Sequence, residues 1–217
     1  MIAAAFVDTR HEYYRVYNVY VPIAVGIFAA IVIIVLVAVL VYRRRPIERA
    51  ARWHENNPLE GAYALLLTCV AAFLLYLTYS AEHATDTLAN AQRPALTVDV
   101  VGAKWEWQFS YPAYGIVARS GTIGRQPLVL PAGEPVRLLL HTQDVIHAFW
   151  VPQARYKHDL IPGSTQIATL TFPHPGSFPG QCAEFCGLRH ADMIYTVLVV
   201  SPARFAAWAR SRGSVAP

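Results

Sequence analysis

The chain has 217 residues, of which 55% are hydrophobic and only 15% are charged. That balance is too apolar for an ordinary soluble domain of this length and indicates membrane segments. The formal net charge is +4, but the part after residue 81 holds 11 Lys and Arg against 9 Asp and Glu, a surplus of two. This part has no basic run interleaved with aromatic side chains, so no nucleic-acid partner is expected.

Two uncharged apolar runs lie in the first 81 residues, at positions 19–42 and 61–81. As a helix, the first run would be roughly 36 Å long at about 1.5 Å per residue, enough to cross a hydrocarbon core of about 30 Å. Tyrosines cluster where the first run begins and where the second ends, as aromatic side chains do at a membrane surface. The first run is also too long for the apolar part of a signal peptide, and its basic flank follows it. The pattern therefore predicts two transmembrane helices.

Arginine predicts the orientation of these helices. Five arginines lie between the two runs, against two before the first run. Because positive charge stays on the cytoplasmic side, we expect the connecting loop inside and both chain ends outside. The expected division is residues 1–90, with helices at about 19–42 and 61–81 and a polar linker, and residues 91–217, an external domain. The sequence thus predicts a multi-pass membrane protein, and its Ala- and Arg-rich composition favours the bacterial plasma membrane over the inner membrane of an organelle.

Short strand patterns fill the external domain. Residues 96–111, LTVDVVGAKWEWQFSY, alternate so that Trp105, Trp107 and Phe109 share one face. Residues 127–142, PLVLPAGEPVRLLLHT, carry Pro and Gly between two apolar runs, which predicts a β-hairpin. Strands are also expected in residues 164–172 and 193–200. Near the end, Ser201 as N-cap and Pro202 in the first turn predict a short helix. Many short strands with Pro and Gly turns favour a β-sandwich or small barrel.

One short segment concentrates metal-binding atoms. Residues 180–193 read GQCAEFCGLRHADM and offer two thiols, an imidazole, a thioether and a carboxylate: Cys182, Cys186, His190, Met193 and Glu184. The preceding PHPGSFPG is rich in Pro and Gly, and we expect it to be irregular. The segment is therefore predicted to form a loop at one end of the β structure.

Three simple explanations leave part of this segment unused. A disulfide within C-x3-C would close a very small loop, stabilise little and leave His190 and Met193 without a role. Zinc would accept two Cys and two His, but a thioether is a soft ligand that suits copper better. A single blue-copper centre would use one Cys, His190, a weak Met193 and a second His from elsewhere, which makes Cys182 superfluous.

Two neighbouring thiolates can instead be shared by two copper ions. Each copper would then need its own imidazole, and one of these must come from outside the loop. His147, in the apolar stretch TQDVIHAFWVP, is the best candidate. His141, His158 and His174 are rivals on spacing alone.

The segment matches the signature C-x-E-x-C-G-x-x-H-x-x-M, and the chain resembles subunit II of the haem–copper cytochrome c oxidases. DVIHAFWVP, YKHDLIPG, WEWQF and the two helices before a β domain agree with this resemblance. It implies a membrane-anchored all-β fold, in which a two-helix transmembrane hairpin precedes a cupredoxin-like β-barrel with a short C-terminal helix. It also implies the CuA centre, a mixed-valence pair of copper ions bridged by two Cys.

Carried over residue by residue, the resemblance implies two bridging thiolates, two terminal imidazoles, a weak thioether and a backbone carbonyl as copper ligands: Cys182, Cys186, His147, His190, Met193 and Glu184. The Glu184 side chain is further implied to approach magnesium at the interface with subunit I. Trp105 resembles the exposed aromatic through which cytochrome c passes its electron, although its pattern alone favours core packing. Glu60 matches a position near the entrance of a proton path in relatives, and a charge at a membrane boundary explains it equally well.

The resemblance implies the following function. The chain would receive electrons from cytochrome c and pass them to haem in subunit I of an aa3-like oxidase, which reduces oxygen to water and translocates protons. Subunit III is a further expected partner. No C-x-x-C-H motif is present, so haem is not expected on this chain. A membrane-anchored copper chaperone or store is the alternative, but it would have no use for His190 and Met193.

The charge of the external domain bears on the donor. Relatives that use a basic cytochrome c show an acidic docking face. Here the domain is slightly basic, and Gln143 and Ser110 stand at places where acidic residues often occur. This departure favours a donor that is less basic or bound to the membrane.

Overall fold

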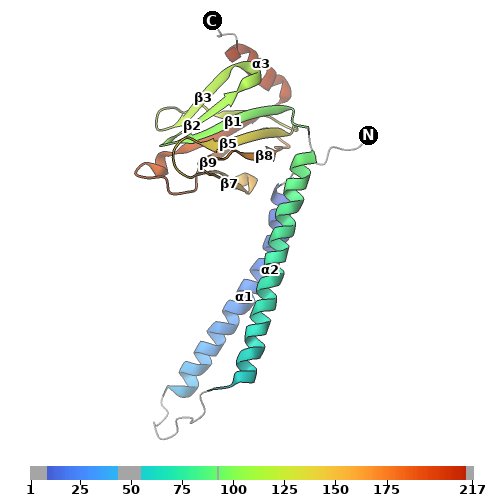
Figure 1. Ribbon diagram of the computed structural model, residues 1–217, viewed down its shortest axis with the longest axis vertical. Helices are drawn as coiled ribbons and strands as arrows, with labels where there is room; N and C mark the ends of the chain where they lie inside the picture. Colours follow the sequence, from blue (N-terminus) through green and yellow to red (C-terminus); the bar gives the residue numbers. More distant parts are fainter. Residues whose placement is uncertain (1–8, 44–54, 92, 214–217) are drawn as a thin grey trace. The chain divides into compact units, whose positions relative to one another are not determined.

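The computed structural model describes residues 9–43, 55–91 and 93–213 (Figure 1). The chain divides into two compact units, one of residues Glu12–His83 and the other of Ala84–Pro217 together with Met1–His11, and each is described by itself. Four of the five arginines that predict the orientation fall in segment 44–54, outside the described residues. The orientation therefore stays a prediction.

Two long helices, α1 (Thr9–Tyr42) and α2 (Asn57–Ala91), contain the apolar runs. The Tyr20 hydroxyl of α1 donates to the Leu74 carbonyl at 2.9 Å and lies 2.7 Å from the Thr78 hydroxyl of α2. By length and composition, residues His11–Tyr42 and Asn57–Thr85 are each able to cross a membrane. α2 continues through the polar stretch that the sequence predicts as a linker, because this stretch contains neither Gly nor Pro to end it.

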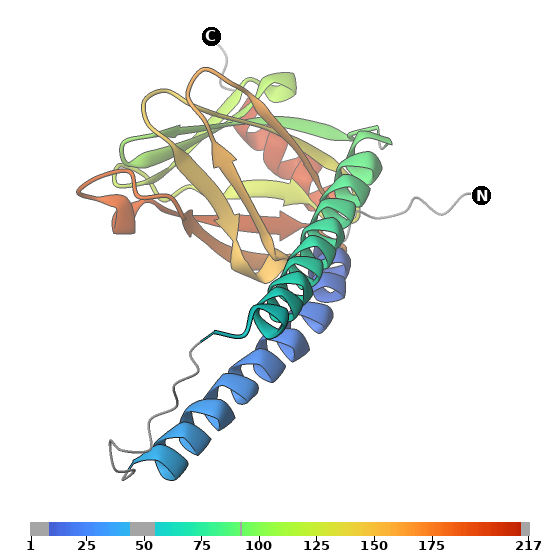
Figure 2. The ribbon, with the colours of Figure 1, turned by 60° about the horizontal axis from the view of Figure 1, so that its bottom comes forward.

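The β domain consists of two five-stranded sheets, whose strands are visible in two views (Figure 1, Figure 2). The first sheet has the order β3-β2-β1-β5-β8, with bounds β1 (Leu96–Ala103), β2 (Glu106–Tyr111), β3 (Ile116–Gly121), β5 (Val136–Thr142) and β8 (Gln166–Leu170). The second has the order β4-β10-β9-β6-β7, with bounds β4 (Leu128–Pro131), β6 (His147–Val151), β7 (Tyr156–Leu160), β9 (Gly176–Cys182) and β10 (Ile194–Val200). Three short 3-10 turns connect strands: η2 (Pro112–Tyr114), η3 (Pro152–Ala154) and η4 (His190–Asp192).

An aromatic core joins the two sheets. The predicted alternation of β2 is confirmed, because Trp107, Phe109 and Tyr111 are all buried. Across the sandwich, the Trp107 ring lies 5.2 Å from the Tyr195 ring, and Tyr195 stacks on Phe149 at 4.8 Å. Such interdigitation of inward-facing side chains is how two packed sheets form one core.

The hairpin predicted for residues 127–142 is wrong. Its two strands lie in different sheets, where β4 pairs in parallel with β10 and β5 pairs in parallel with β1. Residues 132–135 carry the chain across the sandwich instead of reversing it. Pro and Gly mark such a crossing as readily as a hairpin turn, since both need a break in the strand.

The expectation that residues 173–180 are irregular is also wrong for most of the segment. Residues from Gly176 onward form β9, which pairs with β10 along most of its length. β9 has a second neighbour, β6, only at Gln181 and Cys182. Pro179 is therefore tolerated, because it lies where the strand has one neighbour and needs no second row of N–H donors.

The predicted C-terminal helix is confirmed as α3 (Pro202–Gly213). The Ser201 hydroxyl accepts from the Arg204 N–H at 3.4 Å, and the Ser201 carbonyl accepts from the Phe205 N–H at 2.9 Å. The Trp208 ring packs 5.1 Å from the Tyr111 ring, so α3 closes the end of the sandwich at which β2 finishes.

Candidate metal centre

Two neighbouring strands place His147 beside Cys182. The antiparallel register of β6 and β9 pairs Phe149 with Cys182, so His147, two positions before Phe149, lies on the same face of the sheet as Cys182. The Nδ1 atom of His147 is 3.7 Å from the Sγ atom of Cys182, and both side chains are buried. Strand pairing thus brings together His147 and Cys182, which are 35 positions apart in the sequence.

The loop after β9 supplies the remaining donor atoms and projects from one end of the β domain (Figure 1, Figure 2). The Cys182 N–H donates to the Met193 carbonyl at 3.0 Å and closes the loop, while turn η4 folds its far side. As a result, the Cys186 Sγ lies 3.5 Å from the His190 Nδ1 and 3.8 Å from the Met193 Sδ.

The two sulfur atoms meet at the centre of this arrangement. Cys182 and Cys186 are free, buried thiols with their Sγ atoms 3.9 Å apart. Together with His147 they form a group of potential metal ligands whose donor atoms all lie within 4.8 Å of one another. Each sulfur also has an imidazole nitrogen of its own within 3.7 Å.

The rival histidines lie elsewhere. His158 stacks on Tyr156 in β7, His141 lies on β5 opposite Val101, and His174 is exposed in the turn before β9. Within the described residues, the group of potential metal ligands around the two cysteines contains His147 and none of these three.

A second layer of contacts orients His147. Its Nε2 lies 2.8 Å from Asp144 Oδ1, which leaves Nδ1 to face the sulfur. Asp144 is itself held by the backbone N–H groups of Lys104 at 2.8 Å and Val145 at 2.7 Å. Gly102 of β1 makes room for the ring, because a Cβ atom there would lie only 3.1–3.3 Å from three His147 atoms. Sequence analysis missed both Asp144 and Gly102; only Asp144, three positions before His147, carried a local signal.

The charge states of the two thiols differ in the metal-free protein. Burial raises the pKa of Cys182, but the contact with His147 and neighbouring backbone groups outweigh it, and the pKa falls to about 7. Burial and the nearby Cys182 raise the pKa of Cys186 to about 12. Burial lowers the pKa of His147, but its contacts with Cys182 and Asp144 raise it overall. One thiolate therefore forms readily near neutral pH, whereas the second requires the positive charge of a bound metal.

Glu184 has two groups that could act as oxygen ligands, its backbone carbonyl and its side-chain carboxylate. Its backbone carbonyl lies 3.3 Å from the Cys182 Sγ, where the resemblance expects a carbonyl ligand. Its carboxylate accepts from the Lys157 ammonium at 2.7 Å, and Lys157 also lies 3.1 Å from Asp159. The carboxylate that the resemblance assigns to magnesium therefore has a cationic partner within this chain.

Trp105 lies against the metal-binding loop rather than in the centre of the core. Its Nε1–H donates to the Cys186 carbonyl at 3.3 Å, and its side chain is partly exposed. Gly187 allows this approach: its φ of +117° lies in a region that L side chains rarely adopt, and a Cβ there would be 3.4 Å from the indole. Trp105 also packs against the buried core, so its surroundings provide for core packing as well as for contact with the loop.

Glu60 has a structural role at the start of α2. Its carboxylate accepts from the Asn56 N–H at 3.3 Å, while the Asn56 side chain accepts from the Leu59 N–H at 3.1 Å. This reciprocal pattern resembles a capping box, which satisfies free donors at a helix N-terminus. The structure thus explains Glu60 without a proton path.

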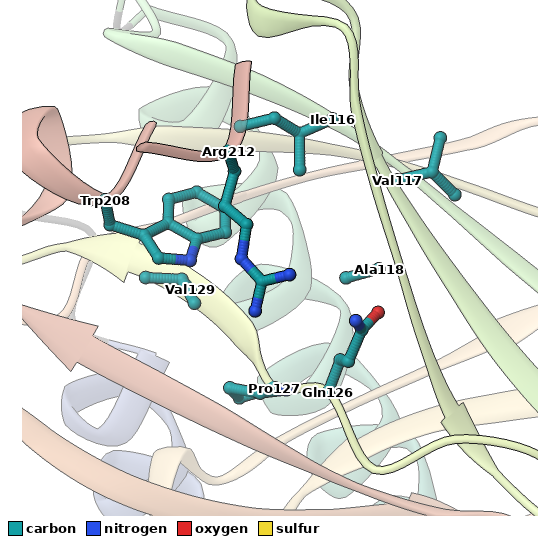
Figure 3. Close-up of a pocket in the computed structure, with 8 residues that line it drawn as sticks. All are labelled: Ile116, Val117, Ala118, Gln126, Pro127, Val129, Trp208 and Arg212. Carbon is teal, nitrogen blue, oxygen red and sulfur yellow. The ribbon is translucent and has the colours of Figure 1, made fainter. Parts of the chain in front are cut away.

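A small surface pocket is lined by residues of β3, β4 and α3 and of the segment that precedes β4. Figure 3 shows Trp208 and Arg212 of α3 facing Gln126 and Pro127 across it. Its lining contains neither Cys nor His, so it is separate from the sulfur cluster.

Comparisons with known proteins agree with this geometry. Residues 122–200, which include His147 and the whole 180–193 loop, match the family model "Cytochrome C oxidase subunit II, periplasmic domain". The crystal structure of the periplasmic domain of subunit II of cytochrome oxidase (CoxB) of Bradyrhizobium japonicum is 30% identical, with a TM-score of 0.54, over 57% of this chain and 96% of that one. The chain belongs to the cytochrome c oxidase subunit II family. Its β domain is accordingly cupredoxin-like.

Curated members of the subunit II family are longer than the matched region. The probable cytochrome c oxidase subunits 2 of Streptomyces coelicolor and Streptomyces avermitilis are 32% and 33% identical to this chain, over 75% and 79% of its residues. The chain spans only 62% and 66% of the length of these two relatives.

Proposed function

We propose that this chain is the electron-receiving subunit of an aa3-like cytochrome c oxidase, in which it binds the binuclear CuA centre. It would accept electrons from cytochrome c and pass them to haem in subunit I, where oxygen is reduced to water and protons are translocated. The observation that carries the proposal is the pair of sulfur atoms 3.9 Å apart, each with its own imidazole nitrogen nearby.

The donor set fits two soft metal ions. Two thiolates can be shared between two ions, and His147 beside Cys182 and His190 beside Cys186 would serve as terminal ligands. Each ion would then need one further, weaker ligand. The Met193 thioether, beside Cys186, and the Glu184 carbonyl, beside Cys182, could supply one such ligand each. Thioether sulfur favours copper over zinc. When bound, the copper pair supplies a one-electron redox centre whose charge is spread over two metals and two sulfurs.

The protein's own contribution is to hold these ligands in one geometry. His147 is fixed by Asp144 on one side and by the lack of a side chain at Gly102 on the other. The Trp107 indole donates to the Met193 carbonyl at 3.2 Å and ties the end of the loop to the core. Cys182 and Cys186 are buried, so water is excluded from the sulfurs. Such rigid support keeps structural change small when the charge of the site changes, and tunes its potential.

Trp105 is the proposed point at which an electron arrives. It is partly exposed, and its hydrogen bond to the Cys186 carbonyl provides a short path from the surface to a bridging ligand. This geometry favours electron transfer through the indole over a purely structural role.

The remaining roles depend on partners of this chain. Subunit I, subunit III and cytochrome c are proposed partners, with the metal end of the β domain on the outer side of the membrane. We also propose that Glu184 contributes to a magnesium site shared with subunit I. Its pairing with Lys157 means that magnesium would have to displace the ammonium or share the carboxylate with it. Glu60 is proposed near the entrance of a proton path, in addition to capping α2.

The decisive experiment is copper loading of the 217-residue chain in detergent. We expect a purple protein with about two coppers per chain and electron-spin hyperfine structure from two equivalent nuclei. A colourless zinc protein or a blue protein with one copper would overturn the proposal. A chain that takes up copper but exchanges no electron with cytochrome c would favour the chaperone alternative.

A further inference from the structure

The most exposed apolar side chains of the β domain lie on loops at its metal end. Among the described residues of this domain, Leu188 is 92% exposed, Phe185 83% and Ile123 76%. The Phe185 ring is tilted against the His190 ring at a centroid distance of 5.8 Å. Large apolar side chains that remain exposed together mark an interaction surface.

Leu188 and Ile123 are held on two loops that both adjoin Trp105. Leu188 follows Gly187, whose backbone packs on the indole. Ile123 follows Thr122, whose N–H donates to the Trp105 carbonyl at 3.2 Å. The indole of Trp105 and its backbone carbonyl are thus each contacted by a loop that carries an exposed apolar side chain.

The charges around Trp105 leave a positive surplus. Three nearby carboxylates are already engaged: Glu106 with Arg119 at 3.4 Å, Asp192 with Arg189 at 3.1 Å, and Asp144 with His147 at 2.8 Å.

Two cations close in sequence to Trp105 and Ile123 have no such partner. Lys104 directly precedes Trp105, and Arg125 closes the loop that carries Ile123. Both side chains are exposed and make no ion pair within the described part of the chain.

We propose that Lys104, Ile123, Arg125 and Leu188, called the Trp105 rim below, form the docking surface for the electron donor. The rim fits a redox protein whose exposed cofactor edge is surrounded by apolar and acidic side chains. Apolar contacts at the centre of such an interface exclude water and supply affinity, and the surrounding charges steer the encounter. This inference rests on the proposed function and adds the chemical character of its donor.

The test uses the copper-loaded 217-residue chain and two soluble c-type cytochromes of similar reduction potential, one acidic and one basic. Stopped-flow absorbance measures the second-order rate at which each reduced cytochrome transfers an electron. At low ionic strength, we expect the acidic cytochrome to react roughly tenfold faster, with a difference that shrinks as salt screens the charges. Arg125→Glu should reduce this preference, and Lys104→Glu combined with Arg125→Glu should reverse it.

The apolar part of the rim is tested separately at high salt. Leu188→Ser and Ile123→Ser should each lower the rate with both cytochromes by about tenfold, as expected when an interface anchor is lost. The matched controls are Ile167→Ser, at an isoleucine of β8 that is 58% exposed, and Arg204→Glu on α3. Neither control should change the rate.

The outcomes separate this inference from the proposed function. Reduction by ascorbate should be the same for every variant, since a small reductant needs no docking surface. If the two-copper spectrum is present but the rim variants behave like Ile167→Ser and Arg204→Glu, the docking surface is wrong and the proposed function stands. If no two-copper centre forms in the unsubstituted chain, the proposed function fails and the inference fails with it.

Discussion

Replacing Gly102 with Ala tests whether the backbone of β1 controls the position of His147. An added Cβ would lie 3.1, 3.2 and 3.3 Å from His147 Cδ2, Cγ and Cβ, whereas ordinary contact begins at 3.4 Å. The imidazole has little room to retreat, because its Nε2 is held by Asp144 and the Trp107 ring lies 6.3 Å from its centre. The substitution should therefore displace the ring by a few tenths of an ångström.

The magnitude follows from two opposing effects on Gly102→Ala. Overpacking a well-packed site costs about 1–3 kcal/mol of the free energy of unfolding. The smaller conformational freedom of unfolded Ala offsets about 0.4–1 kcal/mol, so we expect a net loss between about 0 and 2.6 kcal/mol. Because His147 would no longer face the sulfur pair correctly, copper affinity should also fall by roughly 10- to 100-fold, as when an outer-shell partner of a ligand is lost.

Competition with a copper chelator measures the affinity, and electron-spin resonance reports whether the two copper nuclei remain equivalent. Gly61→Ala is the matched control, because a Cβ at this helical position meets nothing within 4 Å. It should leave both properties unchanged. If Gly102→Ala bound copper with unchanged affinity and an unchanged hyperfine pattern, the close approach of β1 would have no part in placing His147.

Three further substitutions test the other proposed roles. Cys182→Ser should abolish the two-copper spectrum, because it removes one of the two shared sulfurs. Cys69→Ser, at the exposed thiol of α2, is the control and should not alter the spectrum. Retention of the spectrum in Cys182→Ser would refute the shared-sulfur site. Trp105→Phe should leave the copper spectrum intact and slow reduction by cytochrome c by roughly tenfold or more, as for a lost aromatic anchor. Trp150→Phe should have no such effect, and equal rates in the two variants would assign Trp105 to packing. Glu60→Gln keeps an acceptor for the helix cap but cannot carry a proton, so the assembled oxidase should turn over more slowly with intact α2; unchanged turnover and proton uptake would leave Glu60 with its capping role alone.

Features that depend on neighbours in sequence could be predicted without the structure. The two long apolar helices, the alternation of β2 and the capped helix α3 follow from local periodicity and from residues at helix ends. The motif C-x3-C-x3-H-x2-M likewise brings its own donors together, since a loop of 12 residues holds Cys182, Cys186, His190 and Met193 within reach of one another.

The predictions from sequence are wrong for strands whose pairing partner is distant in the sequence. β4 and β5 have the local marks of a hairpin, yet each pairs with a strand from another part of the chain. Pro179 marks a break in sequence, but it is accommodated in β9 because that strand lacks a second neighbour there. A sequence contains the turn signals, whereas the competition among possible strand pairings is decided by packing of the whole core.

The sequence by itself determined the chemistry available to this protein: two thiols, an imidazole and a thioether on one loop, preceded by two segments apolar enough for a membrane. The tertiary structure alone decided which distant groups join them. β6–β9 pairing brings His147 to Cys182, and the close approach allowed by Gly187 brings Trp105 to the loop from 81 residues away. The physical reason is that these contacts depend on register and packing between strands, which no local pattern specifies.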